Sequence, residues 1–75
     1  MRFEAGQRVM ALRAFRGVLI KDLAVVRCGE YRVRAATLMK EREFIALEGD
    51  ALGRWFAADD FEPAKVEVGA DGGAR

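Results

Sequence analysis

The fold of this chain is decided by residues 29–63, which read GEYRVRAATLMKEREFIALEGDALGRWFAADDFEP. Apolar and polar side chains alternate here over short stretches, and Gly, Asp and charged residues separate these stretches. Such a pattern is typical of short β-strands joined by turns. The same stretch holds most of the aromatic side chains of the chain. We therefore predict an all-β domain.

The alternation places five strands along the chain. The predicted strands cover residues 8–13, 31–39, 43–48, 54–58 and 64–68, with one helical or 3₁₀ turn at residues 59–61. Residues 15–28 form a long loop after the first strand, although Leu19, Leu23 and Val26 recur at helical spacing and leave a helix there as an alternative. We expect one domain over residues 1–68 and a flexible tail over residues 69–75.

Four spaced motifs resemble small SH3-like barrel proteins of phages and prophage-bearing bacteria. They are Gly-x-x-Val-x-Ala from Gly6, Gly-x-Tyr-x-Val from Gly29, Leu-Glu-Gly from Leu47, and Trp-Phe-Ala-x-x-x-Phe-Glu-Pro from Trp55. The resemblance covers residues 6–63. It implies a small SH3-like barrel of about five strands with a long loop after the first strand, a phage-derived origin, and a role as modulator or inhibitor of a host system, including host defence.

The residue types in the chain exclude most catalytic chemistry. The sequence contains no His, no Ser and no Asn, and its one cysteine is Cys28. Without His there is no ordinary general base near neutral pH, and Cys28 has no imidazole to activate it as a nucleophile. One Cys without His also cannot form a structural zinc site. We expect no enzyme, no cofactor and no metal.

The chain shows no targeting pattern. Its first ten residues lack the apolar segment of a signal peptide, and its apolar runs are far too short to span a bilayer. A single cysteine cannot form an internal disulfide, which suits a reducing compartment. We expect a cytoplasmic protein with no membrane partner.

The strand pattern predicts an apolar patch on the outer side of the sheet. If residues 40–42 form the first hairpin turn, Met39 pairs with Glu43, and the next hairpin pairs Ile45 with Phe56. The outer patch would then consist of Leu38, Phe44, Ala36, Ala46, Trp55 and Ala57. Apolar patches of this kind mark interaction sites, and Trp often dominates the binding energy of protein interfaces. We predict that this face binds a protein partner or a second copy of the chain, unless the register is shifted or the long loop covers the patch.

Charge is unevenly distributed along the chain, although the net charge is only +1. Residues 1–42 hold ten Lys or Arg and four Asp or Glu, whereas residues 43–75 hold three and eight. Our alternative hypothesis is a nucleic-acid-binding module whose basic strand face includes Arg27, Arg32 and Arg34. In the opposing interpretation, acidic residues of the second half neutralise these arginines across the strands: Glu43, Glu48, Asp50 and Glu62. A third hypothesis is a structural phage component.

The remaining aromatic residues are predicted to be structural. Tyr31, Phe56 and Phe61 are expected in the core, and Phe3 is expected to cover one end of the barrel. Phe15 is expected to anchor the long loop, although an aromatic residue in that loop could also line a peptide groove.

Overall fold

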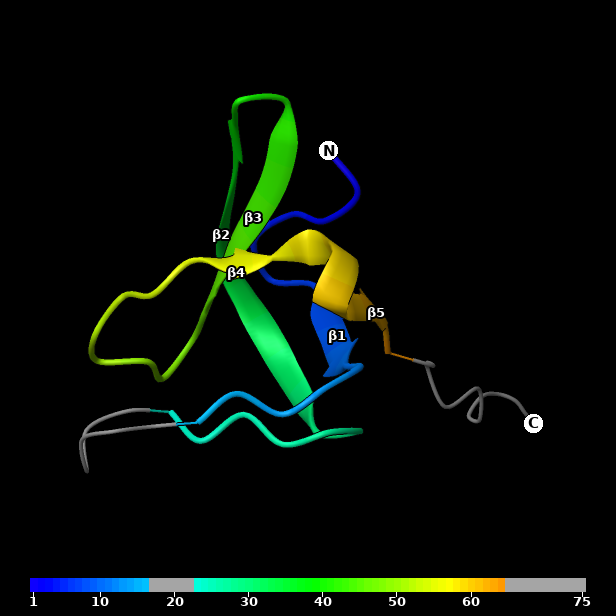
Figure 1. Cartoon of the computed structure of the whole chain (residues 1–75), viewed down its shortest axis with the longest axis vertical. Coiled ribbons are helices and arrows are strands. Elements are labelled where there is room, and N and C mark those ends of the chain that lie inside the picture. The colour runs from blue at the N-terminus through cyan, green and yellow to red at the C-terminus, as the bar shows by residue number, and fades with distance from the viewer. Residues whose placement is uncertain (17–22, 65–75) are drawn as a thin grey trace.

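The computed structural model describes residues 1–16 and 23–64, which form one antiparallel sheet (Figure 1). Its strands are β1 (Arg8–Ala11), β2 (Glu30–Met39), β3 (Arg42–Leu47), β4 (Phe56–Ala57) and β5 (Phe61–Pro63). They lie in the order β4-β3-β2-β1-β5, and each neighbouring pair is antiparallel. The prediction of an all-β domain is therefore confirmed, and the sheet is open, with β4 and β5 at its edges.

The predicted strand positions are close for the first three strands and less accurate near the C-terminus. A 3₁₀ helix, η1 (Ala58–Asp60), begins one residue before the predicted turn. It is followed at once by β5, whose residues Phe61 to Pro63 pair with β1. The closing strand predicted at residues 64–68 therefore starts too late in our prediction. Residues 65–68 and the predicted tail, residues 69–75, lie outside the described residues.

The turn between β2 and β3 contains two residues, Lys40 and Glu41, rather than the predicted three. Both have positive φ angles, 51° and 66°. Two central residues with positive φ suit the right-handed twist of the strands they join, but this conformation is usually taken by Gly, Asn or Asp. Lys-Glu gives no sequence signal for such a turn, which is why a three-residue turn was predicted. The predicted pairing of Met39 with Glu43 is wrong. Met39 pairs with Arg42.

A register shift in β2 between Val33 and Ala35 changes which side chains face the core. Before it, Val33 is buried, and after it Ala36 packs against the core. The prediction put Ala36 and Leu38 on the outer side, and therefore the odd-numbered residues of β2 on the inner side. This alternation holds only as far as Val33. A bulge of this kind bends the strand, so that β2 pairs with β1 through its first residues and with β3 through the rest.

The core consists of apolar side chains from all five strands together with Phe3, Val25 and Ala58. Phe56 and Phe61 lie in it as predicted, with ring centroids 5.9 Å apart. Phe3 is buried, and it belongs to this cluster. Tyr31 is half-buried, because its ring packs on the core while its hydroxyl group contacts the long loop.

The described part of the long loop, residues 12–16 and 23–28, folds back onto the core. Phe15 and Val25 form an isolated β-bridge, and the Phe15 ring lies 5.0 Å from the Phe56 ring in an edge-on arrangement. The prediction that Phe15 anchors this loop is confirmed. The Tyr31 hydroxyl accepts a hydrogen bond from the Val26 N–H (2.8 Å) and donates one to the Ala24 carbonyl (3.1 Å). No helix occurs in these described loop residues, and the positions most relevant to a helix, 17–22, lie outside them.

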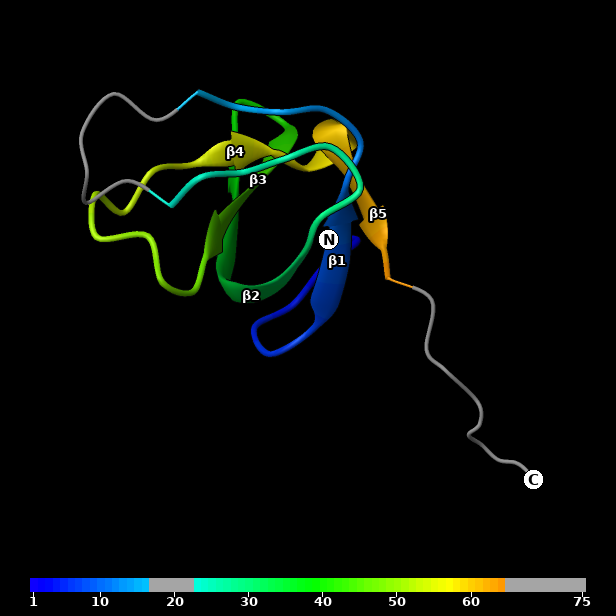
Figure 2. The same cartoon turned by 90° about the horizontal axis from the view of Figure 1, so that it is seen from below.

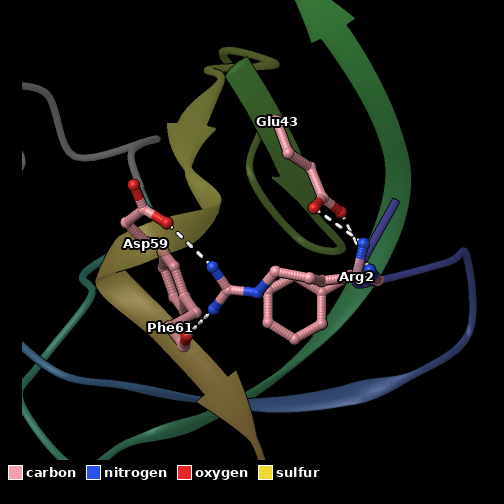
Figure 3. Close-up of polar contacts among 5 residues, drawn as sticks. Arg2, Glu43, Asp59 and Phe61 are labelled. Atoms are coloured by element: carbon pink, nitrogen blue, oxygen red, sulfur yellow. Dashed lines mark hydrogen bonds and ion pairs between the residues drawn. The ribbon is translucent and has the colours of Figure 1, made fainter. Parts of the chain in front are cut away.

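The N-terminal segment is tied to two distant parts of the chain (Figure 3). The Glu43 carboxylate accepts hydrogen bonds from the backbone N–H groups of Arg2 (2.7 Å) and Phe3 (2.8 Å). The Arg2 guanidinium donates to Asp59 Oδ1 (2.8 Å) and to the Phe61 carbonyl (3.3 Å). This segment therefore links β3 to η1 and β5, and Glu43 is engaged by backbone donors rather than by an arginine across the strands.

We predict that Gly29→Ala destabilises the fold by crowding the Tyr31 hydroxyl. A Cβ at position 29 would lie 2.6 Å from Tyr31 Oη and 2.9 Å from Val26 Cγ2. Overpacking of this kind typically costs about 1–3 kcal/mol, which urea unfolding would measure. Tyr31→Phe removes the nearest of these atoms, so the glycine substitution should cost less in that background. Equal costs in both backgrounds would contradict this explanation.

Candidate functional site

The outer face of the β2–β3–β4 part of the sheet is the largest surface that the sequence singled out. Its position follows from the observed pairing. Ala36, Ile45 and Phe56 form one cross-strand row, and all three pack in or against the core. Because successive residues of a strand point to opposite sides, the neighbouring rows face outward. Both rows lie on the outer face. Thr37, Phe44 and Ala57 form the row nearer the β2–β3 turn, and Ala35 and Ala46 form the row farther from it.

Trp55 belongs to the same outer face. It immediately precedes Phe56, whose side chain is buried in the core, so an extended chain directs the Trp55 side chain outward. The side chain is 45% exposed. The predicted pairing of Ile45 with Phe56 is confirmed, and Phe44 pairs with Ala57, which places Phe44 and Ala57 on one face.

The predicted pairing in the first hairpin was wrong by one residue, so the residues of the predicted patch do not all lie on the outer face. Ala36 packs against the core, and Leu38, two residues further along β2, lies on the same inner side. Leu38 is nevertheless 59% exposed, because it is close to the end of the hairpin. A one-residue slip moves every side chain of a strand to the opposite face, so the assignment of Ala36 and Leu38 to the outer patch is wrong.

Ala46 also differs from the prediction, although it lies on the predicted side. Its exposed fraction is 0%, yet it is not a member of the core cluster. It therefore contributes no accessible surface to the outer face. The residues that the sequence analysis missed are Ala35, Thr37 and Met39, and assuming a two-residue turn at Lys40 and Glu41 would have found them.

The loop that carries Trp55, residues 48–55, is built around a buried ion pair. The Asp50 side chain is fully buried, and its Oδ2 accepts hydrogen bonds from the backbone N–H (3.1 Å) and the Nε (3.0 Å) of Arg54. Its Oδ1 accepts a third from the backbone N–H of Leu52 (3.3 Å). Burial raises the pKa of Asp50, but the hydrogen bonds from Arg54 and Leu52 and the charge of Arg54 outweigh burial, so the pKa lies below its ordinary value.

Arg54 also connects this loop to the long loop. Its Nη2 donates a hydrogen bond to the Leu23 carbonyl (2.7 Å), and its guanidinium lies 5.1 Å from the centroid of the Phe56 ring. Figure 2 shows the two loops reaching toward the same side of the sheet. The chain on the N-terminal side of Trp55 is therefore held by the core and by a neighbouring loop.

The three arginines of the predicted basic face are all exposed. Arg32 and Arg34 flank the buried Val33 on β2 and so point outward, whereas Arg27 lies in the turn of the long loop before β2. Within residues 1–16 and 23–64, none of the three takes part in an ion pair. The predicted neutralisation is wrong for Asp50, which pairs with Arg54, and for Glu43, which binds backbone N–H groups.

Two further cations shape the outer face and its border. Arg42 lies 5.8 Å from the centroid of the Phe44 ring. Arg8 stands directly opposite Arg32 in the β1–β2 pair, and its charge is taken up by Glu30 at 2.6 Å. The border of the outer face is therefore basic, with Arg8 compensated and Arg32 and Arg34 without an acidic partner among the described residues.

The described residues offer little for other chemistry. They contain no cluster of three or more side chains suited to holding a metal ion. No helix in this part of the chain has the length and apolar character needed to cross a membrane. Comparison with protein-family models, curated proteins and solved structures gives no significant match. The function must therefore be inferred from the surface itself.

We predict that acid weakens the fold through Asp50. Its folded-state pKa is lowered, so its contribution to stability is present above the unfolded-state value of about 3.9 and is lost as the pH falls through the folded value. Asp50→Asn should cost about 3–5 kcal/mol at pH 7 and make stability less dependent on pH below 4. Urea unfolding at pH 7 and pH 3 would measure both effects.

The control for this prediction is Asp59→Asn. Asp59 also pairs with an arginine, Arg2, but its side chain is 75% exposed, so the pair is screened by solvent. A cost at pH 7 as large as that of Asp50→Asn would contradict the importance of burial.

Proposed function

We propose that this chain is a non-enzymatic binding module with an SH3-like barrel, which recognises a protein through the outer face around Trp55. Support for the barrel comes from the strand order, from β2 taking part in both halves of the sheet, and from the long loop after β1. The 3₁₀ turn between β4 and β5 also fits. The proposal includes a cytoplasmic location, with which one exposed, free Cys28 is compatible.

The observation that carries the proposal is the exposure of Trp55 on a loop held by a buried ion pair. A large aromatic ring that is half in water gains free energy when a partner covers it. Because Asp50 and Arg54 already hold the loop, little conformational entropy is lost when the partner binds. Phe44 and the small side chain of Ala57 lie on the same face and extend the apolar area next to the tryptophan.

The partner is a foreign protein or a second copy of this chain. Both use the same apolar area, but they differ in how the solution mass depends on protein concentration. Self-association through an apolar face persists at high salt, because salt screens charges and does not weaken apolar burial.

We predict that Trp55→Ala leaves the fold intact and weakens binding at least about 30-fold, as expected for a dominant interface residue. Its cost in unfolding free energy should stay near 1 kcal/mol or less, because the side chain is partly exposed. Light scattering at several protein and salt concentrations measures self-association. Trp55 is the only tryptophan, so its fluorescence also reports whether a partner covers it.

The matched control is Leu12→Ala, which shortens an apolar side chain of similar exposure, 42%, beyond the end of β1. It should leave assembly and binding unchanged. If Trp55→Ala unfolds the protein, Trp55 is a core residue. Capture of partners from a cell lysate with immobilised wild type and Trp55→Ala tests binding of a foreign protein. If the two proteins have the same solution mass and capture the same partners, the outer face does not bind.

A second candidate function is nucleic-acid binding, which the outward arginines of β2 favour. Arg34→Gln should then weaken binding to single-stranded DNA and reduce the slope of log affinity against log salt by about 1, because one phosphate contact is lost. Arg8→Gln is the control, since its guanidinium pairs with Glu30. The candidate is rejected if fluorescence anisotropy detects no binding of labelled DNA or RNA at about 50 mM salt, because binding through phosphate contacts is strongest at low salt.

A further inference from the structure

The second half of β2 has an open edge. β1 pairs with β2 only from Glu30 to Arg32, and the last contact beyond these pairs is between Val33 and the backbone of Gly6 and Gln7. From residue 35 to residue 39, the strand pairs with β3 on one side, and residue 34 lies in the register shift. Among the described residues, nothing makes a backbone hydrogen bond to these six residues from the other side. Figure 1 shows the β2–β3 turn beyond the end of β1.

The turn geometry determines which backbone groups reach that edge. In a hairpin with a two-residue turn, the residues that flank the turn, here Met39 and Arg42, exchange both of their hydrogen bonds. Pairs alternate from that point, so Thr37 also bonds to its partner on β3. The N–H and C=O groups of Ala36 and Leu38 point away from β3, to the open edge.

The open edge lacks the usual protection of sheet edges. Edge strands are normally short, charged or interrupted by proline, because unpaired backbone groups invite another strand. The outermost strands of the sheet, β4 and β5, are protected in this way, because β4 has only two residues and β5 ends in Pro63. The open part of β2, residues 35–39, carries no charge and no proline, and Leu38 and Met39 are 59% and 42% exposed.

The charges at the two ends of this run indicate what can occupy it. Arg34 and Lys40 flank the uncharged residues, and neither forms an ion pair within the described residues. Two copies related by a two-fold axis can pair the open backbone groups of Ala36 and Leu38 with one another only if Ala36 stands opposite Leu38. Arg34 would then stand opposite Lys40 at both ends, and like charges directly opposite each other destabilise a strand pair. A second copy is therefore a poor occupant.

We propose that the open edge of β2 accepts an extended segment of another protein with acidic residues about six positions apart and an uncharged stretch between them. The backbone of this segment would pair with Ala36 and Leu38, and its acidic side chains would reach Arg34 and Lys40, roughly 20 Å apart along the strand. This inference does not rest on the outer face, because Ala36 and Leu38 lie at an edge and on the inner side.

Amide hydrogen exchange in the free protein, read residue by residue by NMR, is the first test. The amides of Ala36 and Leu38 should exchange at least about tenfold faster than those of Thr37 and Met39, whose N–H groups bond to β3. Equal protection of all four would mean that the edge is already occupied, and it would overturn the proposal.

The second test is a titration of the ¹⁵N-labelled protein with the peptide Glu-Thr-Val-Thr-Val-Thr-Glu. Saturable shifts centred on Ala36 and Leu38, with slowed exchange of both amides, are expected. The peptide with Lys at both ends should bind at least about tenfold more weakly, and N-methylation of its edge-facing residues should abolish binding. No shift at millimolar peptide, shifts centred elsewhere, or equal binding of the Lys peptide would refute the proposal.

Two protein variants separate this site from the outer face. Leu38→Pro removes a donor that β3 does not use, so the variant should fold and lose the peptide, whereas Trp55→Ala should bind it as the wild type does. The N-methylated peptide decides the matter if Leu38→Pro does not fold. If the shifts of Ala36 and Leu38 depend on protein concentration without peptide, a second copy occupies the edge and the acidic segment is the wrong occupant.

Discussion

The backbone conformation of Lys40 and Glu41 determines which side chains of β2 and β3 face the core and which face outward. With φ angles of 51° and 66°, these two residues reverse the chain in the shortest hairpin turn and set the pairing of β2 with β3. Because side chains alternate along a strand, this pairing decides that Phe44 and Thr37 face outward and that Ile45 and Ala36 face the core. It also decides which backbone groups of β2 remain on the open edge.

The register shift in β2 brings the side-chain phase set by the β2–β3 turn into agreement with the phase that β1 requires. The register shift between Val33 and Ala35 lets Val33 pair with Leu47 although Ala36 pairs with Ile45. Without it, the inward side chains of the two halves of β2 would fall on opposite sides of the strand. The bulge therefore allows one long strand to serve both β1 and β3, and it places both Val33 and Ile45 in a common core.

Polar contacts hold the loops of a domain that is too small for a large core. A chain of this length buries only about 60% of the surface that its unfolded form exposes. Three sets of hydrogen bonds stabilise the fold in addition to the apolar core. They join Asp50 to Arg54, Glu43 to the N-terminal backbone, and the Tyr31 hydroxyl to the long loop. Each joins segments that the sheet itself does not connect or closes a loop on itself.

The sequence by itself determined the all-β class, the positions of most strands, the pairing of Ile45 with Phe56, and the core positions of Phe56 and Phe61, because alternation and aromatic burial are local patterns. It also restricted the chemistry, since side chains that are absent cannot act. The tertiary structure alone decided the phase of the first hairpin, the bulge in β2, and the partners of Glu43 and Asp50. A turn of two residues and a turn of three have nearly the same local pattern here, and only the joint packing of Val33, Ile45 and Leu47 selects one of them.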